Sequence, residues 1–339
     1  MTSRAILFLQ LGGPETLDDV PGFLYRLFSD PDVIRVKPAL LRKAIAAAIA
    51  LGRKKASREL YRSIGGGSPI RRLTEDQTCG VEKLLAARGT SVPVRAAMTC
   101  SAPLVEDVVR ELGASGVRRF LAVPLYPQYS LTTTKGALER SRAAVRRFVP
   151  GGTLFETGSW PTHPLFVQAH ADAIHGEIAR FPDPRPEAVH LLFSAHSIPK
   201  KLVDRKGDPY QREIEASVAA IAERLGNRSP RTLAYQSKLG PVEWLGPATI
   251  DTIARLGRSG ASQVLVVPIA FVTDHVETLY EVDQLFADAA RQAGIEHFRR
   301  TRGLNDDPTF LACLEEIVLA QREFWADSPS PAAPRTEPA

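Results

Sequence analysis

Cysteine is scarce in this chain of 339 residues, and the three present, Cys79, Cys100 and Cys313, lie far apart with no C-x-x-C pair. This spacing argues against a disulfide framework, a structural zinc site and a four-cysteine iron–sulfur cluster. Free cysteines are typical of a reducing compartment, so we expect a cytoplasmic protein.

Long hydrophobic runs are also missing. The sequence has no stretch of 18 or more apolar residues, and its N-terminal MTSRAILFLQLGGPE does not have the layout of a signal peptide. The net charge of +5 is small for this length, so nucleic-acid binding is not expected. Neither a G-x-S-x-G elbow, a P-loop nor an H-E-x-x-H zinc motif occurs.

The chain does contain short, β-branched apolar runs that alternate with helical patterns. We predict strands at residues 5–11, 94–98, 120–125, 189–193, 232–235 and 264–270. Helical periodicity occurs at residues 105–112, 138–148, 164–180, 210–225 and 248–256. This alternation predicts an α/β fold with parallel sheets that are covered on both faces.

The two halves of the chain resemble each other. LFLQLGGP at 7–14 is similar to LFSAHSIP at 192–199, and FLAVPLYPQYSLTTT at 120–134 is similar to VLVVPIAFVTDHVET at 264–278. We therefore predict two doubly wound, Rossmann-like domains. Their predicted bounds are 1–155 and 156–325, and a Pro- and Ala-rich disordered tail follows at 326–339.

An insertion at about residues 35–60 lengthens the first half. Residues 33–58 contain eight Lys or Arg and no Asp or Glu. A helical face there is formed by Leu41, Ile45, Ala48, Ile49 and Gly52. A basic amphipathic helix of this kind lies on an anionic membrane, borders an apolar cleft or packs on its own domain.

Acidic and imidazole side chains follow the strand predicted at residues 264–270. A helix that begins at Asp274 would place Asp274, Glu277 and Glu281 on one stripe, beside His275, at the sheet edge where α/β proteins bind ligands. The same spacing of Asp274 and Glu277 also fits a capping box, with Glu281 in solvent.

His196 follows the strand predicted at residues 189–193, at the same expected sheet edge as His275. A neutral imidazole is the usual base near neutral pH and also a ligand for divalent iron. Tyr126 and Trp244 lie just beyond other predicted strands, where aromatic rings can form the wall of a pocket for a flat apolar ligand. Together these residues favour a functional site over a purely structural explanation.

With these motifs the sequence resembles the ferrochelatase family. The matching segments follow the family order: LGGPETLDDV (11–20), YRSIGGGSPI (61–70), YPQYSLTTT (126–134), FSAHSIP (193–199), GDPY (207–210), QSKLGPVEWLGP (236–247) and VPIAFVTDHVETLYEVD (267–283). The resemblance implies two Rossmann-like domains around a porphyrin cleft, and the insertion of ferrous iron into a porphyrin.

The resemblance also implies roles for particular residues. His196 matches the family's active-site histidine and Glu277 its partner carboxylate, the pair described as binding iron. Asp274, His275 and Glu281 match an acidic ridge that conducts iron or protons. The expected porphyrin contacts are Arg53, Tyr61, Ser68, Tyr126, Trp244 and Leu11.

LQLGGPE and YPQYS look more like the branch that uses protoporphyrin IX, so haem b is the expected product. A coproporphyrin III enzyme and a non-catalytic porphyrin or haem carrier are the alternatives. No cofactor is expected, and no [2Fe–2S] cluster, because the cysteine extension of some relatives is missing. The segment at 38–55 resembles the family's apolar lip, which suggests peripheral contact with the inner face of the membrane. Thr99–Cys100 and Leu285 depart from the family pattern and leave the iron route open.

Overall fold

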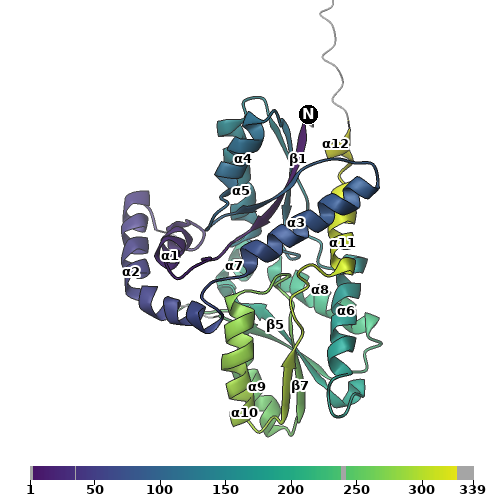
Figure 1. Cartoon of the computed structure of the whole chain (residues 1–339). Helices are drawn as coiled ribbons and strands as arrows, with labels where there is room; N and C mark the ends of the chain where they lie inside the picture. The colour runs from purple at the N-terminus through teal and green to yellow at the C-terminus, as the bar shows by residue number, and fades with distance from the viewer. Residues whose placement is uncertain (1–2, 35, 238–241, 327–339) are drawn as a thin grey trace, which may run out of the picture.

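The computed structural model describes residues 3–34, 36–237 and 242–326, so the tail predicted at 326–339 lies outside these ranges except for its first residue. The described chain forms two four-stranded parallel sheets with the same topology, β2-β1-β3-β4 and β6-β5-β7-β8 (Figure 1). The strands are β1 Arg4–Gln10, β2 Val94–Met98, β3 Arg119–Pro124, β4 Thr153–Glu156, β5 His190–His196, β6 Arg231–Gln236, β7 Gln263–Pro268 and β8 His297–Arg300. The predicted α/β fold with two doubly wound sheets is confirmed.

Helices cover both faces of each sheet, as buried parallel strands require. They are α1 Val20–Ser29, α2 Ala39–Ser63, α3 Ile70–Ala87, α4 Val105–Ala114, α5 Thr134–Phe148, α6 Pro164–Ile178, α7 Lys200–Lys206, α8 Tyr210–Arg224, α9 Thr249–Arg258, α10 Ala287–Gln292, α11 Pro308–Leu319 and α12 Arg322–Trp325. A short 3-10 helix, η1, spans Pro186–Ala188, and a π-helix, η2, spans Glu277–Phe286. Among the described residues, no helix is both long and apolar enough to cross a membrane.

Side chains alternate across the central strands and so connect two different cores. In β1, Leu7 and Leu9 pack with α4 and α5, whereas Ile6 and Phe8 point to the opposite face. That opposite face shares one continuous hydrophobic core with Phe193 and neighbouring residues of the second sheet. The two domains are therefore joined through buried apolar surface.

The similarity between the halves extends to strand register. Pro124 pairs with Leu9 at the end of β3, and Pro268 pairs with Ser194 at the end of β7. Proline lacks an N–H, so it is tolerated where a strand ends. The prediction missed the edge strands β4 and β8, because each has only four residues and neither is fully buried.

Three roles were open for the apolar face of α2: contact with a membrane, the border of a cleft, or packing on its own domain. The observed packing uses mainly another face, with Ile49 at its edge. Its buried residues are Ala46, Ala50, Ser57 and Tyr61, and it packs against α1 at one side of the molecule (Figure 1). By contrast, half of Leu41 is exposed. Small alanines allow close helix packing, so the larger apolar side chains remain available on the surface.

The last helices return to the first domain. Helix α11 packs on α3 as well as on α6, and α12 lies beside the start of β1 (Figure 1). Arg4 in β1 donates to the carbonyl oxygens of Phe324 and Trp325, each at 3.0 Å. The second half of the chain thus contributes cover to the first sheet, and the boundary at 155/156 stays a prediction.

Candidate functional site

His196 and Glu277 form the centre of the candidate site. His196 is the last residue of β5, and Glu277 begins the π-helix that follows β7. Their side chains meet with His196 Nδ1 2.8 Å from Glu277 Oε2. Because β5 lies between β6 and β7, its C-terminal end is next to both neighbouring strand ends. This sheet edge is the usual ligand position in doubly wound folds.

The pair is electrostatically coupled. Partial burial lowers the pKa of His196, but the charge and hydrogen bond of Glu277 outweigh burial and raise the net pKa. Burial raises the pKa of Glu277, yet the adjacent His196 lowers it to about 2. With 38% of its side chain exposed, His196 can still be reached by a ligand. The arrangement provides a base beside a carboxylate that stays ionised at neutral pH.

A second carboxylate lies one turn along the π-helix. Glu281 accepts hydrogen bonds from Ser237 Oγ at 2.8 and 2.9 Å, and Gln236 Nε2 lies 3.4 Å from its Oε2. Ser237 adopts a positive φ of 64°, which aims its hydroxyl at the carboxylate. Burial and the nearby Glu277 raise the pKa of Glu281 to about 7. Two neighbouring acids therefore have widely separated pKa values, as in many acid–base sites.

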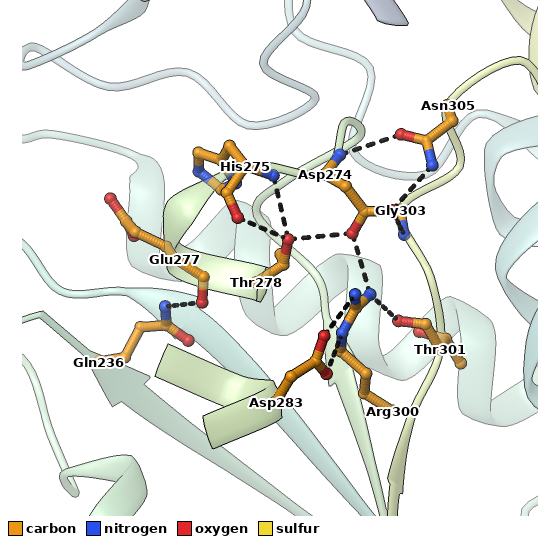
Figure 2. Close-up of polar contacts among 10 residues, drawn as sticks. All are labelled: Gln236, Asp274, His275, Glu277, Thr278, Asp283, Arg300, Thr301, Gly303 and Asn305. Atoms are coloured by element: carbon orange, nitrogen blue, oxygen red, sulfur yellow. Dashed lines mark hydrogen bonds and ion pairs between the residues drawn. The ribbon is translucent and has the colours of Figure 1, made fainter. Parts of the chain in front are cut away.

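Asp274 is not part of this stripe, which corrects the helix start predicted from the sequence. The helix begins at about Val276, and the Asp274 carboxylate points to β8 and the loop after it (Figure 2). It is paired with Arg300 at 2.9 Å and is almost fully buried. Burial raises the pKa of Asp274, but Arg300 and three further donors hold it below its usual value.

The predicted capping box at this turn does not form either. The Asp274 N–H donates to Asn305 Oδ1, Thr278 Oγ1 donates to the Asp274 carboxylate, and the N–H groups of Thr278 and Leu279 donate to the backbone oxygen of His275. The side chain of Glu281 faces Ser237 rather than open solvent.

His275 is held by an aromatic contact. Its ring centroid is 4.4 Å from that of Phe271, and Phe271 is 6.2 Å from the ring of His196. Burial lowers the pKa of His275 even though Glu277 opposes the change. Its Nδ1 is buried without a hydrogen-bond partner in the described part of the chain. His275 is thus neutral near pH 7. The Phe271 ring contacts the rings of both His275 and His196.

The expected porphyrin contacts are distributed over several surfaces. Tyr61 is buried in the cluster formed by α1 and α2, against which Leu11 and Val276 pack. Burial, and then the charge of Glu277, raises the pKa of Tyr61. The structure therefore places Tyr61 and Leu11 between helices α1 and α2 on one side and the start of the π-helix on the other.

Other expected contacts lie elsewhere. Arg53 is exposed on α2, with its guanidinium 5.9 Å from the Phe28 ring centroid. Tyr126 is largely surrounded by protein, and burial raises its pKa. Trp244 forms a backbone bridge to Pro199, and its indole nitrogen is buried without a partner among described residues.

Ser68 borders a cavity between the domains with a volume of about 570 Å³. Residues of the glycine turn and α3 form one side of this cavity, and the π-helix and the loop after β8 form the other. Its lining includes Glu15, Ile64, Gly65, Gly67, Ser68, Pro69, Arg72, Leu73, Asp274, Leu279, Arg302 and Asn305. Neither His196 nor Glu277 lines it, so it is a separate hollow from the His196–Glu277 pair.

Reasoning from the sequence missed three polar residues around the pair. Gln236 is the last residue of β6, paired with His196, and Ser237 follows it, so their position at a strand end was an available signal. Arg300 lies in a strand that was not predicted. In the described chain no group of three His, Cys, Asp or Glu side chains is arranged to hold a metal ion.

Known proteins resemble this chain over nearly all of its length. The Ferrochelatase family model matches residues 3–322. A ferrochelatase of Synechococcus sp. (strain JA-2-3B'a(2-13)) is 44% identical over 327 residues, which cover 94% of this chain and 92% of the relative. A ferrochelatase of Gloeobacter violaceus is 40% identical over 328 residues, with 94% and 98% covered.

Solved structures agree on the fold. SirB from Bacillus subtilis, solved with Fe3+, has a TM-score of 0.51 at 13% identity, with 95% of this chain and 96% of that chain covered. At such low identity the likeness shows the fold alone. The family match and the two close relatives carry more: the chain belongs to the ferrochelatase family, the metal chelatases that insert iron into porphyrins.

Proposed function

We propose that this protein inserts ferrous iron into protoporphyrin IX to form haem b, with His196 and Glu277 as the reacting pair. The observation that carries the proposal is the contact of 2.8 Å between His196 Nδ1 and Glu277 Oε2 at the end of the central strand. Insertion must remove two protons from pyrrole nitrogens while the metal ion loses its water. A base and an ionised carboxylate in contact supply both requirements.

In this mechanism, His196 accepts a pyrrole proton at Nε2, the ring nitrogen that does not face Glu277, directly or through water. The Glu277 carboxylate stabilises the imidazolium that forms, because it already faces Nδ1. While His196 is neutral, it and Glu277 would be the two groups positioned to replace water on the iron that arrives as substrate; after protonation at Nε2, His196 has no lone pair for a metal and only Glu277 would remain. The two pyrrole protons would leave one after the other, because His196 holds a single proton and must release it to water before it accepts the second.

Glu281 completes the proposed route. Its pKa of about 7 lets it take up and release a proton near neutral pH, unlike Glu277. Ser237 Oγ lies 2.8 Å from Glu281 Oε2 and 3.4 Å from Glu277 Oε2, so it connects the two acids. We assign to Glu281 the exchange of protons or iron with solvent. Asp274 is left out of this route because Arg300 and other donors occupy it.

We propose that α2, which contains most of the segment that resembles the family's apolar lip, borders the porphyrin. Leu40, Leu41 and Leu51 are exposed at 82%, 50% and 65%, and Arg53 lies on the same helix. Exposed leucines beside basic residues suit an apolar macrocycle with two propionates, or the surface of an anionic membrane. We retain peripheral membrane contact as a prediction for this surface.

The test is an anaerobic assay of the full chain with protoporphyrin IX and ferrous iron, followed by the change from porphyrin to haem absorbance. We expect multiple turnovers in the wild type and a loss of about 100-fold or more in kcat for Glu277→Ala, since proton-transfer groups contribute at least that much. Glu187→Ala is the control, because Glu187 is an exposed partner of Arg228 far from the site.

Each other outcome identifies an alternative. Near wild-type kcat in Glu277→Ala would refute the proposed role of this carboxylate. Tight porphyrin binding without turnover in the wild type would favour a carrier. A higher kcat/KM for coproporphyrin III than for protoporphyrin IX would assign the protein to the other branch.

A further inference from the structure

Arg300 connects the two sides of the π-helix that carries Glu277 and Glu281. From β8, Arg300 Nη1 donates to Asp274 Oδ1 at 2.9 Å, just before the helix. Its Nε and Nη2 donate to the two oxygens of Asp283, inside the helix, at 2.6 and 2.9 Å. Figure 2 shows the guanidinium between the two aspartates. The side chains of Arg300 and Asp274 are only 12% and 11% exposed, so solvent screens this pair weakly, whereas the Asp283 side chain is 42% exposed.

Asp274 is bound so completely that it acts as an anchor. Its Oδ1 accepts from Arg300 and from Thr278 Oγ1 at 2.9 Å, and its Oδ2 accepts from Asn305 Nδ2 at 2.8 Å and Gly303 N at 3.2 Å. A carboxylate has about four acceptor positions, and all are used here. No lone pair is left to bind iron or to pass a proton.

The approach of the loop after β8 confirms how tight this anchor is. A Cβ on Gly303 would lie 2.8 Å from the Asp274 backbone nitrogen and 3.1 Å from Asn305 Oδ1. Glycine is therefore required at this position for the loop to reach Asp274. The anchor is rigid because β8 is paired with β7, with Arg300 opposite Val266.

A π-helix of this length is unusual. π-helices are rare, occur mostly as single-turn bulges inside α-helices, and are frequent at functional sites. Here ten residues adopt this form. Glu277 and Glu281 lie between the two points that Arg300 holds, so the clamp determines where their carboxylates point.

We propose that Arg300, through Asp274 and Asp283, is a positioning residue that holds the π-helix in the register in which Glu277 meets His196. This inference rests on the proposed function of the His196–Glu277 pair. It assigns Asp274 and Asp283 to the clamp, and it leaves Glu277 and Glu281 as the acids that act on substrate.

The experiment compares Asp283→Asn with Asp288→Asn in the full chain. Asparagine keeps the shape of Asp283 but turns one of its two bonds to Arg300 into a contact between donors. Asp288 is the matched control, since it pairs with Arg291 just beyond the π-helix at 3.0 Å and both side chains are exposed. The rate of amide hydrogen exchange in residues 277–286 shows whether the π-helix is held in place, and this measurement does not depend on enzyme activity. Steady-state kinetics of metallation show whether Glu277 is correctly positioned.

In Asp283→Asn we expect faster exchange across residues 277–286 and a kcat about tenfold lower, the effect of about 1.4 kcal/mol of lost transition-state stabilisation. The KM for porphyrin should stay unchanged, because the clamp contacts no substrate. Asp283→Glu, which restores the charge, should recover most of the kcat, and Arg300→Lys should lose it because lysine lacks the fork that holds two aspartates. Asp288→Asn should match the wild type.

An unchanged rate of hydrogen exchange across residues 277–286 in Asp283→Asn would refute the proposal that Arg300 holds the π-helix through Asp283. Faster exchange with unchanged kcat would overturn positioning, because the clamp would then be only structural. If the wild type shows no turnover, the proposed function fails, while the exchange measurement still decides whether Arg300 holds the helix.

Discussion

At the scale of single residues, sequence reasoning succeeded where chemistry follows strand ends. His196 and the acidic segment both follow central strands of one sheet, and such ends are adjacent in any doubly wound fold, so their proximity was predictable. The direction of Asp274 was not predictable. Its partners Arg300 and Asn305 belong to a short edge strand and the loop after it, which have no apolar pattern to reveal them.

Glu281 offers a pH-dependent test at this scale. Its folded pKa of about 7 lies above the ordinary 4.5, so the folded state binds the proton more tightly than the unfolded state does. Stability is therefore lost as pH rises from 4.5 through 7. We expect Glu281→Gln to raise the free energy of unfolding at pH 8 by about 1–3 kcal/mol, and to have no such effect below pH 4.5.

Urea unfolding at pH 4 and pH 8 measures this difference. Equal stabilities of the variant and the wild type at pH 8 would contradict the raised pKa. A stabilised variant would show that the site keeps Glu281 at a cost in stability, as functional acids often are kept.

At the scale of elements, α2 was predicted as a helix, but the face that packs on α1 was not identified. The apolar pattern marks large side chains, whereas the observed contact uses small buried residues such as Ala46 and Ala50, which allow α1 to approach closely. A single sequence does not distinguish an apolar face that packs from one kept for a ligand. The exposed Leu40 and Leu51 are therefore consistent with a binding surface.

Two glycines in helices provide a matched prediction. Gly52 in α2 is exposed, and a Cβ there would meet nothing within 4 Å, so Gly52→Ala should stabilise the protein by about 0.5–1 kcal/mol. A Cβ on Gly257 in α9 would lie 2.2 Å from the Ala293 carbonyl oxygen. Gly257→Ala should destabilise by about 1–3 kcal/mol because the helices must separate.

The midpoint of denaturant unfolding compares the two variants under one condition. The helical propensity of alanine is the same in both, so only the surroundings differ. Destabilisation by Gly52→Ala would mean that α2 does not continue as a helix through this position.

At the scale of the whole molecule, the two sheets and their strand order followed from the sequence because buried parallel strands have a strong apolar pattern. The contacts between domains did not follow. Gln77 in α3 is fully buried and donates to Thr273 Oγ1 at 3.2 Å and the Asn305 oxygen at 2.8 Å, on loops of the other domain. A polar residue inside a helical pattern gives no indication of so distant a partner.

Gln77→Leu should therefore destabilise the protein by about 1–3 kcal/mol, since the Asn305 carbonyl loses its donor in a buried position. We also expect a lower kcat, because Thr273 immediately precedes the anchor at Asp274. Urea unfolding and the metallation assay measure both effects. Gln211→Leu is the control, as Gln211 donates to Glu215 on an exposed surface. Equal effects of the two variants would contradict a specific role for Gln77.

The bond between Arg4 and the Phe324 carbonyl joins residues 320 positions apart. During translation β1 leaves the ribosome early, but the segment that completes its surroundings is synthesised last. Helix α3 covers part of the apolar face that carries Ile6 and Phe8 early in synthesis, but the cover is completed only when the second sheet and α11 have been made. We therefore expect the first domain to reach its final packing only after the C-terminal helices have left the ribosome.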